Sequence, residues 1–270
     1  MDGKELIKAL HNGKRIYGTL IISPSPAWVE AVEGTGLDCV FLDTEHMPLD
    51  NHQLAWMCQA YKAKGIAPIV RITKPDPHEA TKALHTGASA VVAPYVETAE
   101  EVEQLRAAVK LRPVKGKRLR GILSGSERPQ EQLSSYLEKF NEGKALIANI
   151  ESVPAIEALD EILAVPGLDG LLIGPHDLSC SLGVPEQYDH PLVVEAVHRI
   201  IEKARAKNVG VGVHNWPSAE GEIELAKAGL NLILHFSDMT MFRNALFRDL
   251  GKIRKALGDK VVSRLSEQAI

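Results

Sequence analysis

The sequence of 270 residues has few cysteines, no excess of basic charge and no long apolar run. Its three cysteines are widely spaced and form no Cys-x-x-Cys pair, so we expect no disulfide framework and a reducing, cytoplasmic setting. The 31 basic and 35 acidic residues give a net charge of −4, which argues against nucleic acid as a partner. No segment approaches the roughly 18 apolar residues of a membrane span, and the first residues show no apolar signal-peptide core, so no membrane partner is expected.

The composition is that of a folded globular protein, with 45% hydrophobic and 24% charged residues. Short apolar runs rich in β-branched residues alternate with longer segments of helical period, clearest at 51–64, 99–110, 191–207 and 218–228. The predicted strands are Ile16–Ile22, Asp38–Leu42, Ala67–Ile72, Ser89–Ala93, Ala145–Ile150, Asp169–Ile173, Val209–His214 and Asn231–Phe236.

Most of these strands are continuous apolar runs, which indicates a parallel sheet buried on both faces. The helices tend to end in a glycine before the next strand, as at Gly65, Gly87 and Gly229. Eight strand–helix units in a chain of this length predict a (β/α)8 TIM barrel, an α/β fold. An open, doubly wound sheet is the competing fold.

No linker or change of composition divides the chain, so we expect a single barrel domain over residues 1–257 and a polar tail over 258–270. The longest irregular stretch is Arg112–Gln130, which is basic and contains glycine. A loop of this length inside a compact domain is usually a lid or part of an interface.

Polar residues gather where the predicted strands end, and the carboxyl ends of the strands carry the active site in a TIM barrel. Such carboxylates also cap helices, which alone could account for Glu151 or Asp177, but capping does not account for the whole set with Arg71 at the same rim. In chain order the candidates are Asp43, Glu45, His46, Arg71, Asn149, Glu151, His176, Asp177, His214 and His235.

Glu151 and Asp177 follow neighbouring strands and form the carboxylate pair that a hard divalent cation such as magnesium prefers. Asp43 and Glu45 are placed to hold the waters of that cation. Arg71 beside them would grip a carboxylate in a bidentate fork. The set therefore predicts a site for a small, anionic, oxygen-rich ligand.

Other mechanisms have little support in the sequence. No HExxH, P-loop or GxSxG motif occurs, and Gly34-Thr35-Gly36 precedes a strand, where a dinucleotide fingerprint would follow one. A Schiff-base enzyme needs a lysine aimed into the barrel, and Lys74, in the loop after the third strand, is the only near candidate.

With these residues in view, the sequence resembles the HpcH/HpaI aldolase family, the metal-dependent class II pyruvate aldolases of the phosphoenolpyruvate/pyruvate barrel superfamily. The resemblance runs in order and spacing from about Gly18 to Phe242. Its pieces are Phe41-Leu42-Asp43-Thr44-Glu45-His46, Val70-Arg71, Gly87 to Pro94, Ile150-Glu151 and Ile173-Gly174-Pro175-His176-Asp177-Leu178-Ser179.

The resemblance implies roles for individual residues. Glu151 and Asp177 would bind a divalent cation (Mg²⁺, Mn²⁺ or Co²⁺), Arg71 would hold the keto acid and His46 would act as acid and base. The family also suggests a hexamer that exchanges its last helices between neighbours. The further substrate-binding residues would be Asn149, His176 and Ser179.

Three departures from the family pattern concern the site. His176 stands where a small residue often lies against the keto acid. The segment from Gly121 to Ser126 does not follow the usual small-residue loop, which affects the aldehyde pocket. His85 stands where relatives often carry an acidic partner for the base, so His46 is predicted to be a weaker base here.

The implied reaction is cleavage of a 4-hydroxy-2-oxo acid to pyruvate and an aldehyde through the pyruvate enolate, with oxaloacetate decarboxylation as a side activity. A metal-bound hydroxide is an alternative base to His46. Two other functions stay open: an acyl-CoA lyase like the citrate lyase β subunit, and a non-catalytic barrel that binds keto acids.

Overall fold

The computed structural model describes residues 1–262, which fold into a closed barrel of eight parallel strands with helices between them. The strands run in chain order around the barrel. They are β1 (Ile16–Leu20), β2 (Cys39–Asp43), β3 (Ala67–Arg71), β4 (Ala90–Ala93), β5 (Ala145–Ile150), β6 (Gly170–Ile173), β7 (Gly210–His214) and β8 (Leu232–Ser237).

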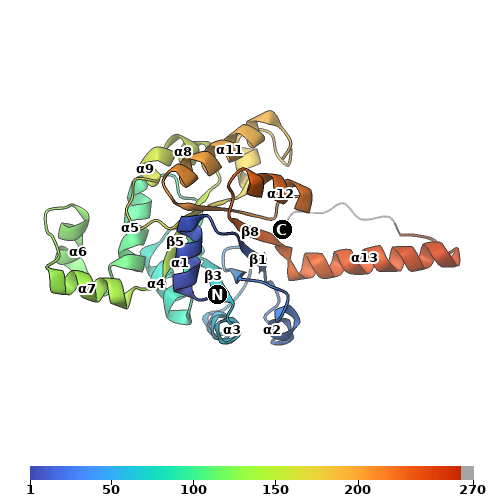
Figure 1. The fold of residues 1–270 in the computed structure, drawn as a ribbon, viewed down its shortest axis with the longest axis horizontal. Coiled ribbons are helices and arrows are strands. Elements are labelled where there is room, and N and C mark those ends of the chain that lie inside the picture. Colours follow the sequence, from blue (N-terminus) through green and yellow to red (C-terminus); the bar gives the residue numbers. More distant parts are fainter. Residues whose placement is uncertain (263–270) are drawn as a thin grey trace.

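The helices cover the outside of this barrel and close one end of it (Figure 1). They are α1 (Gly3–Asn12), α2 (Ala27–Val32), α3 (Asn51–Ala63), α4 (Pro77–Thr86), α5 (Ala99–Lys110), α6 (Gly116–Leu123), α7 (Glu131–Phe140), α8 (Val153–Glu157), α9 (Leu159–Ile162), α10 (Pro175–Ser181), α11 (Pro191–Ala206), α12 (Ala219–Lys227) and α13 (Asp238–Leu257).

The predicted (β/α)8 barrel is confirmed, and the open sheet is excluded because β8 pairs with β1 and closes the ring. Each strand pairs in parallel with the next, as the continuous apolar runs indicated. The register joins Asp43 of β2 to Arg71 of β3, so both residues end their strands at the same rim. Register thus brings together side chains that are 28 positions apart in sequence.

The core has two layers, one inside the barrel and one between the strands and the helices. The inner layer includes Phe41, Ile69 and Leu172 from the strands, and α1 adds Leu6 and Leu10 from below. Asp2 and Glu5 form a capping box at the start of α1, which satisfies backbone donors that the helix leaves free. α1 therefore closes the amino-terminal end of the barrel, and the opposite rim stays open.

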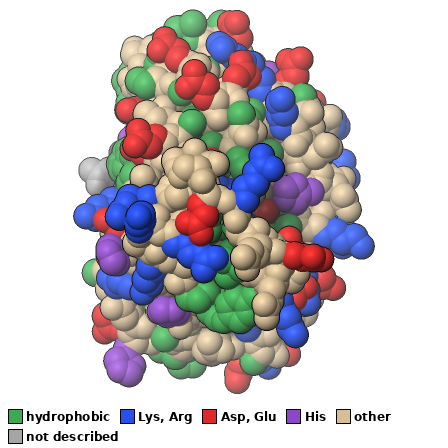
Figure 2. All heavy atoms as spheres, turned by 90° about the vertical axis from the view of Figure 1, so that its left-hand side faces the viewer, with side chains coloured by type: hydrophobic (Ala, Val, Ile, Leu, Met, Phe, Trp, Pro, Cys, Tyr) green, Lys and Arg blue, Asp and Glu red, His purple; other side chains and the backbone are tan. Residues whose placement is uncertain are grey.

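The segment Arg112–Gln130, predicted to be irregular, contains the helix α6 between two short connections. Together α6 and α7 extend from the barrel at one side (Figure 1). Figure 2 looks onto this side of the molecule and shows Lys and Arg side chains across its middle. The regular structure was missed because the apolar residues of α6 are few and only half-buried.

α13 differs from the other helices because it projects away from the barrel (Figure 1). Of its 20 residues only Asp238, the first, is buried. Most of the predicted tail 258–270 lies outside the described residues. Within residues 1–262, no helix combines the length and the apolar character needed to cross a membrane.

Candidate active site

Arg71 and Asp43 form a buried ion pair at the open rim. Arg71 donates from Nε to Asp43 Oδ1 at 2.9 Å and from Nη2 to Oδ2 at 2.6 Å. Burial alone would raise the pKa of Asp43, but the hydrogen bonds and charge of Arg71 outweigh burial and hold that pKa below its usual range. The two parallel bonds fix the plane of the guanidinium at the mouth of the barrel.

His46 lies beside this pair, half-exposed to the rim. Its Nδ1 is 2.7 Å from Arg71 Nη2 and 3.2 Å from Asp43 Oδ2, and Glu45 Oε2 lies at 3.8 Å. A guanidinium only donates, so Nδ1 accepts from Arg71 in the neutral tautomer that carries its proton on Nε2. In the other tautomer Nδ1–H donates to Asp43. His46 therefore has an acidic partner, supplied by its own loop.

Within one chain, the structure does not bring His85 to His46. His85 is exposed in the last turn of α4, which delivers the chain to the start of β4. His46 follows the end of β2, so the two histidines lie at opposite ends of the barrel. The carboxylate beside His46 comes instead from Asp43, three residues earlier in the same chain. A resemblance at the single position of His85 could not show this.

Glu151 directly follows β5 and is buried at the same rim, with 4% of its surface exposed. Oε1 accepts a hydrogen bond from the Tyr95 amide at 2.8 Å, and Oε2 accepts one from Asn149 Nδ2. Burial, with the negative charges of Asp177 and Glu45, raises the pKa of Glu151 to about 7. The Tyr95 amide and the charge of Arg71 favour the ionised form of Glu151, but they do not outweigh burial.

Asp177 lies half-buried in the first turn of α10, where its charge acts on both Glu151 and Glu45. The turn before it comes very close to Glu151: a Cβ on Gly174 would lie 2.5 Å from Glu151 Oε2. Glycine at position 174 therefore lets the two elements meet. The result is a convergence of three carboxylates, Glu45, Glu151 and Asp177.

Asn149 is 1% exposed, and its Oδ1 has no hydrogen-bond partner, although its amide donates to Glu151. A buried carbonyl oxygen without a partner beside mutually repelling carboxylates is a donor set that fits a hard divalent cation. Asp43, Glu45 and His46 also bring ligand atoms within 4.8 Å of one another and could hold a metal. In that second cluster, however, Asp43 and Glu45 already form ion pairs with Arg71.

Two residues expected to contact substrate differ in what they do. Ser179 is fully buried; it donates to the His176 carbonyl at 2.7 Å and accepts from the Glu186 amide at 3.0 Å. In the free protein its hydroxyl is therefore engaged in holding the turn after α10. His176 itself is exposed at the start of α10, with Nδ1 4.0 Å from Glu186 Oε1.

Tyr95 contributes to the site and was missed from the sequence. It lies just after β4 with φ of +51°, a left-handed conformation that is uncommon for a residue other than glycine. Its backbone amide holds Glu151, and its side chain hydrogen-bonds to Glu45. The signal was weak because a lone tyrosine after a strand is ordinary; the strained backbone appears only in three dimensions.

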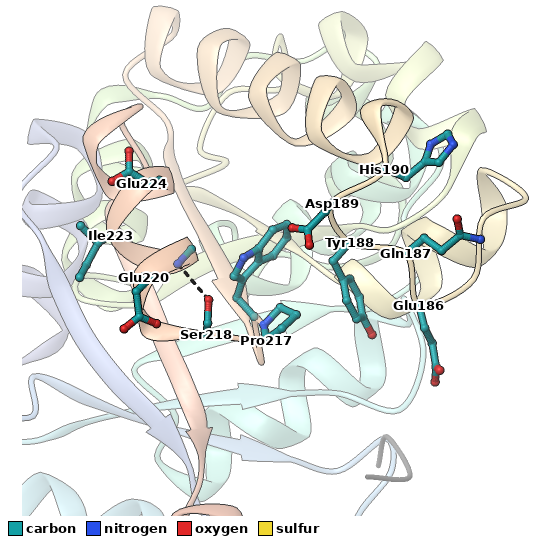
Figure 3. A pocket seen from close by; sticks show the side chains of 12 residues that line it. Glu186, Gln187, Tyr188, Asp189, His190, Pro217, Ser218, Glu220, Ile223 and Glu224 are labelled. Atoms are coloured by element: carbon teal, nitrogen blue, oxygen red, sulfur yellow. Dashed lines mark hydrogen bonds between the residues drawn. The ribbon is translucent and has the colours of Figure 1, made fainter. Parts of the chain in front are cut away.

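A hollow of about 740 Å³ lies beside this rim, between the loop before α11 and the start of α12 (Figure 3). Trp216 and Tyr188 line it, and four carboxylates surround it: Glu186, Asp189, Glu220 and Glu224. This negative charge opposes the binding of an anionic ligand. The predicted catalytic and metal-binding residues do not line this hollow.

The fold and the polar rim are those of a barrel enzyme, and similarity to known proteins narrows the class. The HpcH/HpaI aldolase/citrate lyase family matches residues 17–244. A 2-keto-3-deoxy-L-rhamnonate aldolase of Klebsiella pneumoniae subsp. pneumoniae is 30% identical over 92% of each chain. A hydroxypyruvate/pyruvate aldolase of Rhizorhabdus wittichii is 33% identical over 82% of this chain and 87% of that protein.

The crystal structure of an HpcH/HpaI aldolase from Desulfitobacterium hafniense matches with a TM-score of 0.79 and 27% identity, covering 93% of this chain and 96% of that one. The chain belongs to the HpcH/HpaI aldolase/citrate lyase family. It is an aldolase, a carbon–carbon lyase, as its sequence predicted. The non-catalytic alternative is thereby set aside.

Proposed function

We propose that this aldolase is metal-dependent and cleaves a 4-hydroxy-2-oxo acid to pyruvate and an aldehyde. The observation that carries the proposal is the convergence of Glu45, Glu151 and Asp177 next to the partnerless Oδ1 of Asn149. Glu151 and Asp177 would hold the cation, with Mg²⁺, Mn²⁺ and Co²⁺ as the candidates. When bound, the cation supplies Lewis-acid stabilisation for charge on the substrate oxygens.

Arg71 binds the keto acid in this proposal. Asp43 occupies Nε and Nη2, so Nη1 is the part of the guanidinium left for a substrate oxygen. The ion pair holds that donor in place before the substrate arrives, and a preorganised donor stabilises charge that develops during the reaction. Asn149 and His176 are further candidates for substrate contact.

His46 is the proposed base. In the cleavage direction it takes the proton of the C4 hydroxyl through Nε2, which requires the tautomer in which Nδ1–H donates to Asp43, 3.2 Å away, in place of the tautomer in which Nδ1 accepts from Arg71. The C3–C4 bond then breaks, the aldehyde leaves, and the bonding electrons pass to the pyruvate enolate, which is protonated at C3. Oxaloacetate decarboxylation reaches the same enolate without that first proton transfer and is the proposed side activity.

An acyl-CoA lyase is the weaker alternative, although the family name includes citrate lyase. Coenzyme A carries several negatively charged phosphates. The hollow beside the rim is lined by four carboxylates, whose charge would repel them. A Schiff-base mechanism also has little support, because Lys74 is exposed and lies 3.7 Å from Asp76.

We further propose that α13 packs on another copy of the chain. α13 and the described residues after it expose large apolar side chains, which a helix of a monomer would normally bury. Because α13 projects away from the barrel, Tyr17 on β1 is also left 47% exposed. The apolar residues on α13 are Met239, Met241, Phe242, Leu246, Phe247, Leu250, Ile253 and Leu257. A homo-oligomer, with the hexamer as the family's suggestion, would cover both surfaces. The three free cysteines fit the proposed cytoplasmic location.

The function is tested by steady-state pyruvate release from 4-hydroxy-2-oxo acids, with magnesium and with excess chelator. We expect release only with the metal. Full activity in excess chelator would overturn the metal-dependent mechanism, and no pyruvate from any hydroxy-keto acid would overturn the substrate class.

A further inference from the structure

The hollow between the loop before α11 and the start of α12 contains two aromatic side chains that the proposed reaction does not use (Figure 3). Tyr188 and Trp216 have ring centroids 6.1 Å apart, and their ring planes are inclined by 55°. Two inclined rings form two walls, and the faces of both attract a positive charge placed between them. A volume of about 740 Å³ is that of a site for a small organic molecule.

The acidic groups around these rings have little positive charge to balance them. Glu186, Asp189, Glu220 and Glu224 line the hollow, and no lysine or arginine of the described chain does. Glu224 lies 2.7 Å from Lys227, but Asp189 and Glu220 form no ion pair within residues 1–262. A carboxylate in the first turn of a helix also stabilises that helix, which could account for Glu220, but Asp189 lies outside both helices. The hollow therefore favours a positively charged ligand.

The carboxylates of the hollow are too far apart to hold one metal ion. Within residues 1–262, the only metal-ligating side chains that bring three ligand atoms within 4.8 Å of one another are Asp43, Glu45 and His46, at the rim. Figure 3 shows Glu186 and Glu220 on opposite sides of the hollow. Carboxylates spread around two aromatic rings fit a larger cation, and alkylated ammonium ions are the cations that aromatic rings bind in this way.

Trp216 adds an unused hydrogen-bond donor to the hollow. The residue is 7% exposed, and its Nε1–H has no acceptor within residues 1–262. Gly221 lines the same hollow, and a Cβ on it would lie 2.2 Å from Trp216 Nε1. Glycine at position 221 therefore leaves the space beside the donor open. Because a largely buried indole N–H usually finds an acceptor, an oxygen atom of the ligand is the partner that the site lacks.

We propose that this hollow binds an alkylated ammonium compound that carries a hydroxyl or carbonyl oxygen. The ammonium group lies between Tyr188 and Trp216, and its alkyl groups contact the two rings and the exposed side chain of Ile223. The ligand oxygen accepts the hydrogen bond from Trp216 Nε1, and Asp189 and Glu220 balance the positive charge. The residues proposed to bind the metal and the keto acid do not line this hollow, so the site is separate from that of the reaction.

The test compares choline with 3,3-dimethylbutan-1-ol, which has the same shape and the same hydroxyl but no charge. Both are titrated into the full chain by calorimetry, and the indole N–H resonance of Trp216 is followed in parallel. We expect choline to bind at least about tenfold more tightly than the neutral alcohol, and tetramethylammonium, which has no oxygen, to bind about threefold more weakly than choline. Asp189→Asn combined with Glu220→Gln should remove the preference for charge. Glu195→Gln, at an exposed position of α11 outside the hollow, is the matched control.

A pair of variants at position 188 separates the role of the ring from a structural role. Tyr188→Phe keeps the aromatic face and should bind choline as wild type does, whereas Tyr188→Leu should lose most of the binding. Equal affinity for choline and the neutral alcohol, no binding of millimolar choline, or binding that leaves the Trp216 resonance unmoved would each overturn the proposal. A Trp216 resonance that moves with acetate or inorganic phosphate and not with choline would make the hollow an anion site instead. No readout depends on aldolase activity, so this test stands apart from the proposed function.

Discussion

Arg71 meets both oxygens of Asp43 with one edge of its guanidinium, Nε to Oδ1 at 2.9 Å and Nη2 to Oδ2 at 2.6 Å. The two residues are paired in the register of β2 and β3, so the strands themselves set this geometry. The remaining edge of Arg71 is presented to the rim in a fixed direction. We therefore expect catalysis to depend on the planarity of residue 71 as well as on its charge.

Arg71→Lys should lower kcat/KM for pyruvate release by roughly 10²-fold or more, in line with the loss of one preorganised donor. Lysine keeps the charge, but its ammonium group lacks the planar fork. It cannot make two parallel hydrogen bonds to Asp43 and at the same time offer a further fixed donor to the substrate. Steady-state kinetics would show the effect, with Arg199→Lys at an exposed position of α11 as the matched control. A variant at wild-type rate would mean that Arg71 is structural.

Glu151→Gln and Asp177→Asn should each weaken Mn²⁺ binding, measured by calorimetry or electron paramagnetic resonance, by at least about tenfold. The exposed Glu157→Gln should bind as wild type does. Because the pKa of Glu151 is raised to about 7, its carboxyl is protonated below that pH. Metal affinity should then rise as the pH increases through 7. Undiminished binding in both variants would place the metal at Asp43 and Glu45.

His85→Asp should leave the pH profile of kcat/KM superimposed on that of wild type. The residue lies at the closed end of the barrel, and Asp43 already faces His46 at the rim. Asp43→Asn should instead reduce the rate, because it removes both the partner of His46 and the anchor of Arg71. A shift of the acidic limb in His85→Asp would imply contact through a neighbouring subunit.

Leu246→Glu combined with Leu250→Glu should shift the protein toward smaller species in sedimentation velocity. Both side chains are exposed on α13, 45% and 43% respectively, and charge there is unfavourable only if another copy covers them. Arg248→Glu on the same helix, where Asp249 lies 2.9 Å away, controls for added acidity. A wild-type protein that sediments as a monomer would refute the assembly.

Stability should depend on pH through His11. Nδ1 lies 2.8 Å from the Asn208 carbonyl and Nε2 lies 3.0 Å from Asp169 Oδ1, and both partners only accept, so the ring is charged. The hydrogen bond to Asp169 is the main cause that raises the pKa of His11. Its contribution is present below about pH 6.5 and is lost as pH rises through the folded pKa.

Thermal unfolding of wild type and His11→Gln, followed from pH 5.5 to 8.5, would measure this term. The advantage of wild type should be about 1 kcal/mol or less, since the ring is more than one-third exposed, and it should shrink toward alkaline pH. His198→Gln should show no such trend. An advantage that grows with pH would have the wrong sign for a charged His11.

The barrel was predictable because its strands are local signals. Continuous apolar runs, as in β2 and β6, can be buried only in a parallel sheet, and their polar ends identify the rim. The expectation that Arg71, Asp43 and Glu151 lie at one rim was reached in this way. The predicted bounds of each strand lie within about two residues of those observed.

What the sequence did not reveal depends on three-dimensional placement. Tyr95 matters through its backbone amide, which carries no residue signature, and Ser179 is turned inward by a loop whose path no motif encodes. His85 was misplaced because alignment to a family gives position along the chain and not the end of the barrel. α6 was missed because its few apolar residues pack on little of the core.

The plug formed by α1 has a consequence for traffic through the enzyme. Leu6 and Leu10 fill the lower barrel, and Gly210 has no side chain because Leu10 occupies that space. The barrel is therefore open at one end, so the substrate enters and both products leave past Arg71 and Tyr95. The product that binds deeper must leave last, so the fold itself sets the order in which the two products are released.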